Sequence, residues 1–267
     1  MSWSAGGSSP QRCALLSVPD PHKEAVQAEF ERAAETFGRR TAGRFDDLGV
    51  AAFSRAEPGC LVAEVGAGTG NFLKLFAGVA SRLVAVDLTH AMLARARADA
   101  PAIEAVVADG ALMPLRSRSV DLIASAQTFH HIREPLRILK EMKRVMAPEG
   151  RLLIVDQVAP ENFEQAAAMH ELEAIRDPTH AASRPPSAFR ILVGAVGLDI
   201  TDEKIVDVSH RLSAWMWPEE FPPQRIAAVR DFIERRGGST GMDWRREDDD
   251  WVYTRQRMML LAERPRH

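Results

Sequence analysis

The sequence predicts an α/β fold of the doubly wound type, in which a mostly parallel sheet of seven strands carries helices on both faces. Strand-like and helix-like segments alternate from residue 61 to residue 155, which is typical of parallel strands joined by crossover helices. The strand segments, such as LVAEV and RLLIV, are nearly continuous apolar runs, as expected where both faces of a sheet are buried. The first strand also leads directly into a glycine-rich turn.

The N-terminal part should contain a flexible tail followed by two helices. Residues 1–19 are mostly small and polar, so we expect little order there. Apolar residues then recur at helical spacing over 22–41. A second helical stretch over 44–55 stops before a proline and a glycine. These helices, within 22–55, open a single domain that we expect to span 20–267.

The rest of the chain should provide the sheet, its helices and two insertions. Strands are expected at 61–65, 82–86, 103–107, 120–125, 151–155, 199–208 and 252–262. The last strand should run antiparallel beside its predecessor. Helices are expected to begin at Gly70 and at His90, to span 134–146, and to occupy 161–176, 186–196 and a stretch ending at Arg235. A helical lid over 157–190 and a cap over 211–250 should close above the site.

Composition limits the classes of function. The 267 residues are 46% hydrophobic and 27% charged, as in a globular domain. A net charge of -3 provides no field that would attract nucleic acid, so a small-molecule substrate is expected. Cys13 and Cys60 match neither a disulfide framework nor a zinc spacing. With no signal peptide or membrane span in sight, we expect a cytoplasmic protein, either a monomer or a homodimer.

The run VAEVGAGTGN at 62–71 is the most informative motif. Its glycines at alternate positions permit positive φ angles and let the backbone approach a ligand closely. A dinucleotide-binding turn, G-x-G-x-x-G, would need its third glycine at residue 71, where the chain has Asn71. The spacing therefore argues against a nicotinamide-dependent oxidoreductase.

Polar residues also follow the ends of the next strands, where ligands bind in doubly wound sheets. They are Asp87 after the second strand, Asp109 and Gly110 after the third, and Gln127, His130 and His131 after the fourth. Asp87 lies 21 residues beyond Gly66, near the spacing at which an acidic residue accepts hydrogen bonds from ribose hydroxyls. The pattern therefore indicates a nucleoside-containing ligand.

From about residue 30 to residue 197, the chain resembles the class I S-adenosylmethionine-dependent methyltransferases, in the branch of the ubiquinone and menaquinone methylases. The glycine turn carries this resemblance together with VDLTHAML, VVADGALMPL, SVDLIASAQTFHHI and EMKRVMAPEGRLLIVD. It implies S-adenosylmethionine as cofactor, with Asp87 on the ribose, Leu88 and Met92 beside the adenine, and Asp109 and Gly110 at the adenine amino group. The implied donor-binding residues are Glu64, Gly66, Ala67, Gly68, Gly70, Asp87, Leu88, Met92, Asp109, Gly110 and Gln127.

Catalytic residues are expected at the histidine pair. His130 or His131 could act as a general base toward the acceptor, because imidazole titrates near neutral pH; an orienting or packing role is the alternative. Many relatives place a tyrosine on the N-terminal helix above the methyl donor, whereas this chain has Phe37 there. An aromatic face at that position could still stabilise the sulfonium.

Substrate contacts are expected from Phe37, Arg176, His180 and Trp217. No metal is expected, because the HELEA run lacks the second histidine of a zinc-binding H-E-x-x-H motif. The sequence thus predicts methyl transfer to an oxygen or carbon atom of a small aromatic or apolar molecule. A non-catalytic module that only binds the donor, or a nicotinamide-dependent oxidoreductase, is the alternative.

Overall fold

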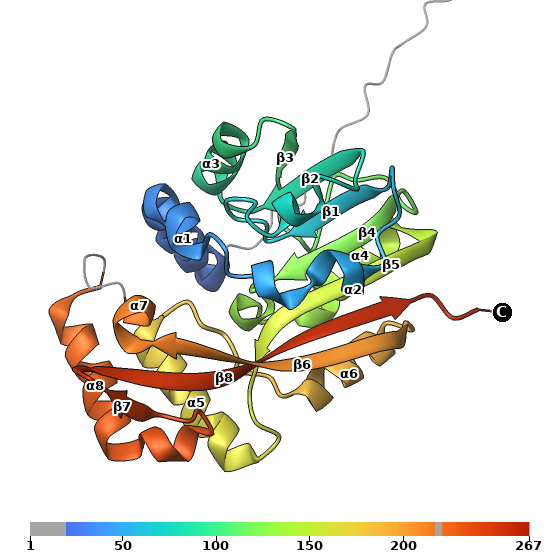
Figure 1. Cartoon of the computed structure of the whole chain (residues 1–267). Helices are drawn as coiled ribbons and strands as arrows, with labels where there is room; N and C mark the ends of the chain where they lie inside the picture. The colour runs from blue at the N-terminus through green and yellow to red at the C-terminus, as the bar shows by residue number, and fades with distance from the viewer. Residues whose placement is uncertain (1–19, 217–220, 267) are drawn as a thin grey trace, which may run out of the picture.

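One twisted sheet forms the centre of the protein. The computed structural model describes residues 20–216 and 221–266, and within them eight strands run in the order β3-β2-β1-β4-β5-β8-β6, with β7 paired to β8 outside this path (Figure 1). The strands are β1 Leu61–Val65, β2 Arg82–Asp87, β3 Ile103–Val107, β4 Val120–Ala126, β5 Met146–Val158, β6 Asp199–Arg211, β7 Arg245–Glu247 and β8 Asp250–Glu263. The seven predicted strands are all present, and the short β7 is an addition.

The pairing directions confirm the predicted sheet. Strands β3, β2, β1, β4 and β5 are joined by parallel pairs. Strand β8 is antiparallel both to β5 and to β6, between which it lies. The carboxyl ends of the five parallel strands therefore meet at one edge of the sheet.

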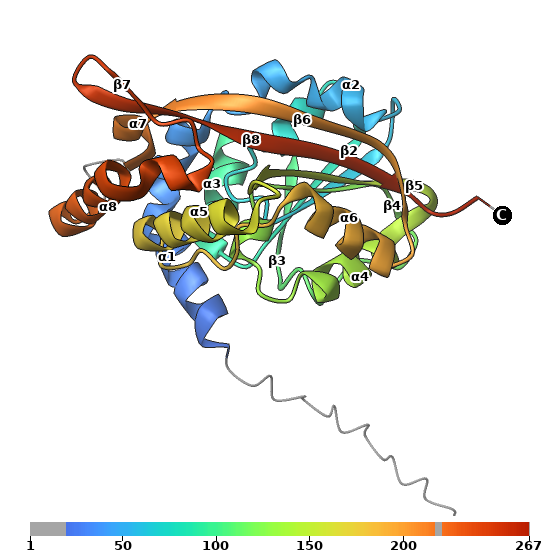
Figure 2. The ribbon, with the colours of Figure 1, turned by 90° about the horizontal axis from the view of Figure 1, so that it is seen from below.

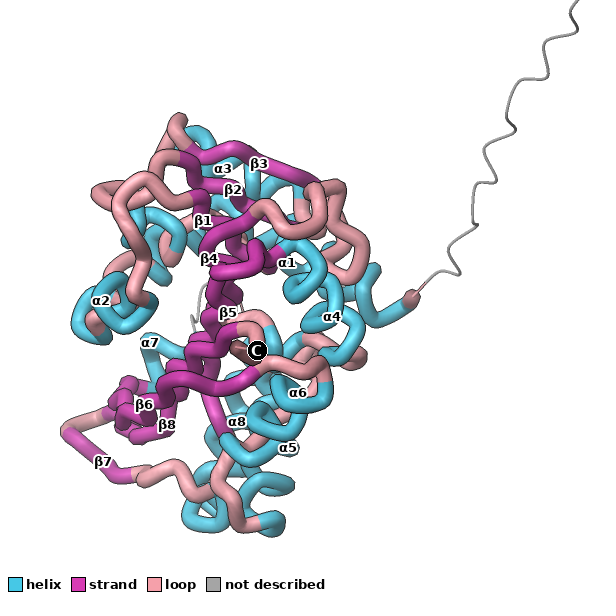
Figure 3. Tube along the Cα trace, turned by 90° about the vertical axis from the view of Figure 1, so that its right-hand side faces the viewer, coloured by secondary structure: helices cyan, strands magenta, loops and turns pink. Residues whose placement is uncertain are grey.

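Helices cover both faces of the sheet, as the apolar strands predict. Along β5, Leu152 and Ile154 enter one buried cluster, whereas Leu153 and Val155 enter the other. Helices α4 (Pro135–Val145) and α6 (Pro186–Ala195) pack on the first cluster. Helices α2 (Val50–Ser54) and α3 (His90–Asp99) pack on the second. Figure 3 shows α4 and α6 on one side of the sheet and α2 on the other.

The first helix confirms the expectation for 22–41. Helix α1 spans Pro21–Thr41, and the Asp20 carboxylate caps it by accepting hydrogen bonds from the backbone N–H groups of His22 and Lys23. The predicted tail, residues 1–19, lies outside the described residues.

Two predicted helices were wrong in form. The stretch 44–55 is split into a 3-10 turn at Asp46–Leu48 and α2, because Gly49 between them has a φ of 66°. After the glycine turn the chain forms only a 3-10 segment at Leu73–Phe76. Most of the hydrogen bonds there join residues three apart, such as Ala77 N–H to Lys74 O, and not the residues four apart of an α-helix.

The lid and cap segments pack together beside the ends of β6 and β8. The two long strands lie side by side (Figure 1), and helices α5 (Phe163–Arg176), α7 (Leu212–Met216) and α8 (Pro223–Arg236) lie together on one side of them (Figure 2). They share a third buried cluster that includes Leu172, Trp215, Phe232 and Tyr253. Among the described residues, no helix has the length and apolarity needed to cross a bilayer.

Candidate active site

A cavity of about 540 Å³ lies at the carboxyl ends of the parallel strands, beneath α1. Most of the residues predicted from the sequence line it: Phe37, Glu64, Gly66, Ala67, Gly68, Asp87, Leu88, Met92, Asp109, Gly110, Gln127, His130, His131 and Arg176. Gly70 and His180 are outside the lining, and Trp217 lies outside the described residues. The fold therefore gathers residues from four strand ends around one space.

The glycine turn serves two different purposes at neighbouring positions. Gly66 has a φ of 70°, and a Cβ atom there would lie 2.3 Å from Thr128 Cγ2, so the backbone fits tightly against the end of β4. Gly68 has a φ of 52°, and a Cβ there would meet only the Phe37 ring, at 3.9 Å. Gly68 thus leaves free space between the turn and the ring of Phe37. Asn71 is not directed at a ligand, because its side chain donates hydrogen bonds to α1 at Gly38 O and Thr41 Oγ1.

Asp87 ends β2 beside this turn. Its two carboxylate oxygens accept hydrogen bonds from the backbone N–H groups of Gly68 and Thr89, both at 2.8 Å. Burial raises the pKa of Asp87, and these hydrogen bonds oppose the rise. Each oxygen retains a second lone pair, so the carboxylate can still accept from a hydroxyl. Leu88 and the fully buried Met92 extend the same wall.

Asp109 connects the end of β3 to α1. Its Oδ2 lies 2.7 Å from Lys23 Nζ, and its Oδ1 accepts a hydrogen bond from Ala111 N–H. Burial pushes the pKa of Asp109 upward, but the contacts with Lys23 and Ala111 outweigh it and leave the pKa below its ordinary value. Gly110 beside it is tightly packed, since a Cβ there would lie 2.6 Å from Val65 Cγ1. Helix α1 is therefore attached across this end of the cavity.

Three polar side chains that line the cavity, those of Glu64, Gln127 and Gln157, are incompletely satisfied. Glu64 Oε2 and Gln127 Nε2 are buried and have no hydrogen-bond partner among the described residues. Burial, followed by the nearby charge of Asp87, raises the pKa of Glu64 well above its ordinary value. A buried polar atom without a partner is costly, so an acceptor and a donor here fit a ligand that carries both an ammonium and a carboxylate.

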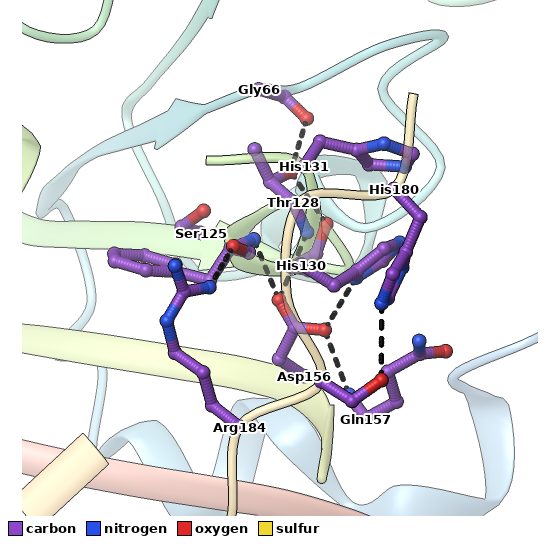
Figure 4. Close-up of polar contacts among 12 residues, drawn as sticks. Gly66, Ser125, Thr128, His130, His131, Asp156, Gln157, His180 and Arg184 are labelled. Carbon is purple, nitrogen blue, oxygen red and sulfur yellow. Dashed lines mark hydrogen bonds and ion pairs between the residues drawn. The ribbon is translucent and has the colours of Figure 1, made fainter. Parts of the chain in front are cut away.

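His130 forms a hydrogen-bonded pair with Asp156, which the sequence did not indicate as a site residue. His130 Nδ1 lies 2.8 Å from Asp156 Oδ1 (Figure 4). The fully buried Asp156 also accepts hydrogen bonds from the backbone N–H groups of Thr128, Phe129 and Gln157. Burial pushes the pKa of Asp156 upward, but His130 and the backbone donors hold it below its ordinary value. Because Nδ1 is engaged, Nε2 is the ring nitrogen of His130 that remains for the cavity.

The turn that carries His130 is braced from a second direction. The Arg184 guanidinium donates hydrogen bonds of 2.6 Å to the carbonyl oxygens of Phe129 and Ile132, on either side of the histidine pair (Figure 4). The 3-10 turn Phe129–His131 is thus held between Asp156 of β5 and Arg184 of the lid segment. This bracing fixes the position of the His130 ring.

His131 has a different environment from its neighbour. Its Nδ1 lies 3.1 Å from Thr179 O, and its backbone oxygen is 2.7 Å from His22 Nε2. The Phe30 ring packs edge-on against it. Burial, followed by the charge of His130, lowers the pKa of His131 to about 4. His131 therefore connects α1 to the lid segment as a neutral ring, without a carboxylate hydrogen-bonded to it.

His180 lies next to this pair. Its ring stacks 5.8 Å from that of His130, and its Nε2 is 3.0 Å from Ser183 Oγ (Figure 4). Burial and the neighbouring histidines lower its pKa to about 2. No group of three or more metal-ligating side chains that could hold an ion is found among the described residues.

The end of the cavity toward the lid and cap segments contains both rings and charges. Trp215 and Phe221 line it, and the Arg176 guanidinium lies 4.8 Å from the centre of the Trp215 ring. Further charged side chains line the same end: Arg44, Glu173, Asp177 and Arg255. An acceptor that is apolar throughout is not favoured by this lining.

Asp156 and Arg255 are the main residues that the sequence reasoning missed. Asp156 follows the apolar run RLLIV just as Asp87 follows RLVAV, so the rule that selected Asp87 would also have selected Asp156. Arg255 gave no comparable signal, because it is one of several charged residues within an expected strand near the end of the chain.

Comparisons with known proteins agree with this geometry. Residues 63–154 match a family model described as a methyltransferase domain. The chain is 26% identical to the uncharacterised methyltransferase YcgJ of Bacillus subtilis, over 71% of this chain and 78% of that protein. A solved structure of YcgJ superposes with a TM-score of 0.75 at 18% identity, covering 81% of this chain and 97% of that one, which shows a shared fold.

The names of two further relatives refer to different acceptors of those proteins. The chain is 27% identical to a demethylmenaquinone methyltransferase of Renibacterium salmoninarum, over 53% of this chain and 60% of that protein. It is 33% identical to the probable tRNA methyltransferase 9B of Homo sapiens, over 49% of this chain and 30% of that protein. The chain therefore spans less than two thirds of the length of either relative.

Proposed function

We propose that this chain, a member of the class I S-adenosylmethionine-dependent methyltransferases, methylates an oxygen or carbon atom of a small aromatic molecule with His130 as general base. The observation that carries the proposal is the His130–Asp156 pair, in which His130 lines the same cavity as the glycine turn and the buried Asp156 lies behind it. When bound, S-adenosylmethionine supplies an electrophilic methyl group on a sulfonium.

The residues of the cavity fit this donor. Glu64 Oε2 is a free acceptor for the ammonium of the methionine part, and Gln127 Nε2 is a free donor for its carboxylate. An ammonium beside Glu64 would also favour its ionised form, against the burial that now raises its pKa. Asp87 is assigned to the ribose hydroxyls and Asp109 to the adenine amino group. Leu88, Met92 and the backbone at Gly110 would enclose the base.

His130 would act on the acceptor. The hydrogen bond that His130 Nδ1 donates to Asp156 fixes the ring and stabilises the imidazolium that forms when Nε2 takes a proton from an acceptor hydroxyl or acidic carbon. Phe37, above the free space at Gly68, would place an aromatic face near the sulfonium. Positioning the two reactants lowers the activation barrier more than the base does, by about 7 to 11 kcal/mol in favourable cases.

A small acceptor is supported by the cavity, whose volume of about 540 Å³ is that of a small-molecule site. Its rings, which include Phe30, Phe45, Trp215 and Phe221, favour an aromatic group. A tRNA acceptor, which the human relative suggests, would need a positive outer field, and the net charge of -3 does not supply one.

The test is transfer of a labelled methyl group to a panel of substituted phenols, with bulk tRNA as the competing acceptor. For any phenol that is methylated, His130→Asn should lower kcat by about 100-fold or more, the usual contribution of a general base. The matched variant His131→Asn should lose less than about tenfold, because that ring has no carboxylate partner. S-adenosylhomocysteine affinity, measured by calorimetry, should be unchanged in both variants.

Three outcomes would contradict the proposal. Equal losses in the two histidine variants would remove the assignment of the base. Labelling of tRNA in place of every phenol would overturn the acceptor class. Binding of S-adenosylhomocysteine without turnover of any acceptor would favour a module that only binds the donor.

A further inference from the structure

Four arginines from three distant parts of the chain gather at and beside the cavity wall. Arg44 follows α1, Arg176 ends α5, and Arg255 and Arg257 lie on β8. Arg257 Nη1 donates a hydrogen bond of 2.9 Å to the backbone oxygen of Arg44, which joins two of these parts directly. Arg44, Arg176 and Arg255 line the cavity.

Among the described residues, carboxylates compensate this cluster only in part. Arg255 Nη1 lies 2.8 Å from Glu173 Oε1. Arg176 Nη1 is 4.0 Å both from Glu173 Oε2 and from Asp177 Oδ2, at the limit of an ion pair. Asp156 also acts on Arg255 and Arg257 electrostatically, but its oxygens are already bound to His130 and to three backbone N–H groups.

Arg44 is the least compensated member. Its guanidinium makes no hydrogen bond or ion pair with any of the described residues, although the group is half-buried beside three other arginines. Burial, followed by the positive charges of Arg255, Arg257 and Arg176, lowers the pKa of Arg44 to about 9. The same charges contribute, after burial, to lowering the pKa of the nearby His210 to about 3. A partly buried positive charge without a partner is unfavourable unless an anion binds it.

We propose that Arg44 and Arg176 form a carboxylate-binding subsite, and that the methyl acceptor is therefore an aromatic acid. This inference rests on the proposed function. The planar guanidinium fork matches the two oxygens of a carboxylate. The Trp215 and Phe221 rings, with Arg176 4.8 Å and 5.6 Å from their centres, would pack against the aromatic part. A monoanion is favoured over a phosphate dianion, because Glu173 and Asp177 would repel the second charge.

The test is calorimetry on the full chain saturated with S-adenosylhomocysteine. The probes are benzoate, phenylacetate and 3-phenylpropionate, each paired with its neutral amide, and phenyl phosphate as the dianion. At least one acid should bind about tenfold or more tightly than its amide, as expected for a charge-assisted contact. Phenyl phosphate should bind more weakly than that acid.

Variants locate the contact. Arg44→Gln and Arg176→Gln should each weaken the preferred acid about tenfold and leave the amide unchanged. Arg44→Lys should lose less, because lysine keeps the charge without the planar fork. Arg230→Gln on the exposed face of α8 is the matched loss of one positive charge and should have no effect. Unchanged S-adenosylhomocysteine affinity in each variant shows that the fold is intact.

The results of these experiments can reject the carboxylate-binding subsite and the proposed function independently of each other. The subsite is overturned if no acid binds more tightly than its amide, or if the preference survives both glutamine variants. Methylation of neutral phenols without any preference for acids would also reject the subsite while the proposed function stands. An acid preference that depends on Arg44, without turnover that depends on His130, would support the subsite and contradict the proposed base.

Discussion

At the scale of single residues, the site contains buried charges in two opposite states. Asp156 is saturated, with His130 and three backbone N–H groups as donors. Such a carboxylate can stay charged although it is buried, because hydrogen-bond donors occupy the lone pairs of both its oxygens. The guanidinium of Arg44, by contrast, has three like charges around it and no hydrogen-bonded partner among the described residues. The first arrangement stabilises the fold, and the second is expected to cost stability until a ligand binds.

Arg44→Gln should therefore stabilise the ligand-free protein. The pKa of Arg44 is lowered from 12.5 to about 9, so its charged form is disfavoured in the folded chain. The cost is fully present below pH 9 and disappears only as the pH rises through the folded and then the unfolded value. Solvent screening reduces it to the order of 1 kcal/mol, which corresponds to a rise in Tm of about 2 to 4 °C at pH 7.

Differential scanning calorimetry without ligand measures this change. Arg230→Gln, an exposed charge on α8, serves as the control and should leave Tm within about 1 °C. Addition of the preferred aromatic acid should raise the Tm of the parent protein more than that of Arg44→Gln, because only the parent keeps the full subsite. The Tm difference between the two proteins should therefore shrink or reverse. A lower Tm for Arg44→Gln in the absence of ligand would mean that the guanidinium is already compensated.

At the scale of elements, two glycines of the same turn have different roles: Gly66 is needed for close packing, and Gly68 leaves space for a ligand. Gly66→Ala should destabilise the fold by about 2 kcal/mol or more, because its Cβ would lie 2.3 Å from Thr128 at a positive φ. Gly68→Ala should cost only about 1 kcal/mol, since the one atom near its Cβ is in Phe37, at 3.9 Å. Its methyl group would instead occupy the space beside the donor and weaken S-adenosylhomocysteine binding.

Urea unfolding and calorimetry with S-adenosylhomocysteine distinguish the two glycine variants. Gly66→Ala should be identified mainly by its lower midpoint of unfolding. Gly68→Ala should be identified mainly by weaker binding at nearly unchanged stability. The interpretation of Gly68 would be wrong if Gly68→Ala bound S-adenosylhomocysteine as tightly as the parent chain.

The sheet could be predicted because its sequence signals are local. Strands such as β1 and β5 are apolar on both faces, and turn residues separate them from the helices. The residues of each segment are therefore enough to predict that it is a buried strand. The same reasoning failed where one backbone angle decides the outcome. Gly49, with a φ of 66°, divides the expected helix over 44–55, and a glycine within a helical pattern does not reveal its φ.

The strand-end residues that line the cavity could be predicted from the sequence, but the arginine cluster could not. Glu64, Asp87 and Asp109 lie at or just after the ends of successive strands, and the parallel topology brings such ends together. The arginine cluster depends on contacts between residues far apart in the chain, such as Arg44 and Arg257. Nothing in the local sequence of either residue indicates that its partner is another arginine.

At the scale of the whole molecule, several elements depend on histidines that stay neutral when buried. The pKa values of His131, His180 and His210 are lowered to about 4, 2 and 3 respectively, in each case mainly by burial. These residues belong to the turn after β4, the lid segment and β6. Neutral imidazoles thus contribute to the contacts between the turn after β4 and the lid segment, and to the contact of His210 with Tyr253 on the neighbouring strand.

The stability of the whole chain should consequently fall as the pH drops below 6.5. A histidine with a lowered folded pKa takes up a proton in the unfolded chain before it does so in the folded one. Its contribution is therefore complete above pH 6.5 and is lost as the pH falls toward the folded pKa. Glu64 acts in the opposite direction, because its raised pKa lets the folded chain hold a proton that the unfolded chain has released. A net uptake of about one to two protons on unfolding gives a loss of about 1.4 to 2.7 kcal/mol per pH unit.

Thermal unfolding at pH 7.0, 6.0 and 5.0 at constant ionic strength measures that loss, which corresponds to a decrease in Tm of about 3 to 10 °C per pH unit.

The variant His210→Phe tests whether buried histidines cause this loss of stability. The substitution keeps an aromatic ring beside Tyr253, whose ring centre lies 5.4 Å away, but removes one titrating group. The slope should then decrease by about 1.4 kcal/mol per pH unit where that group titrates. A Tm that is constant or rises from pH 7.0 to 5.0 would show that Glu64, together with Asp87, whose pKa is also raised, outweighs the histidines. An unchanged slope in His210→Phe would show that this ring is already protonated in the folded chain, which would contradict the effect inferred for the arginine cluster beside it.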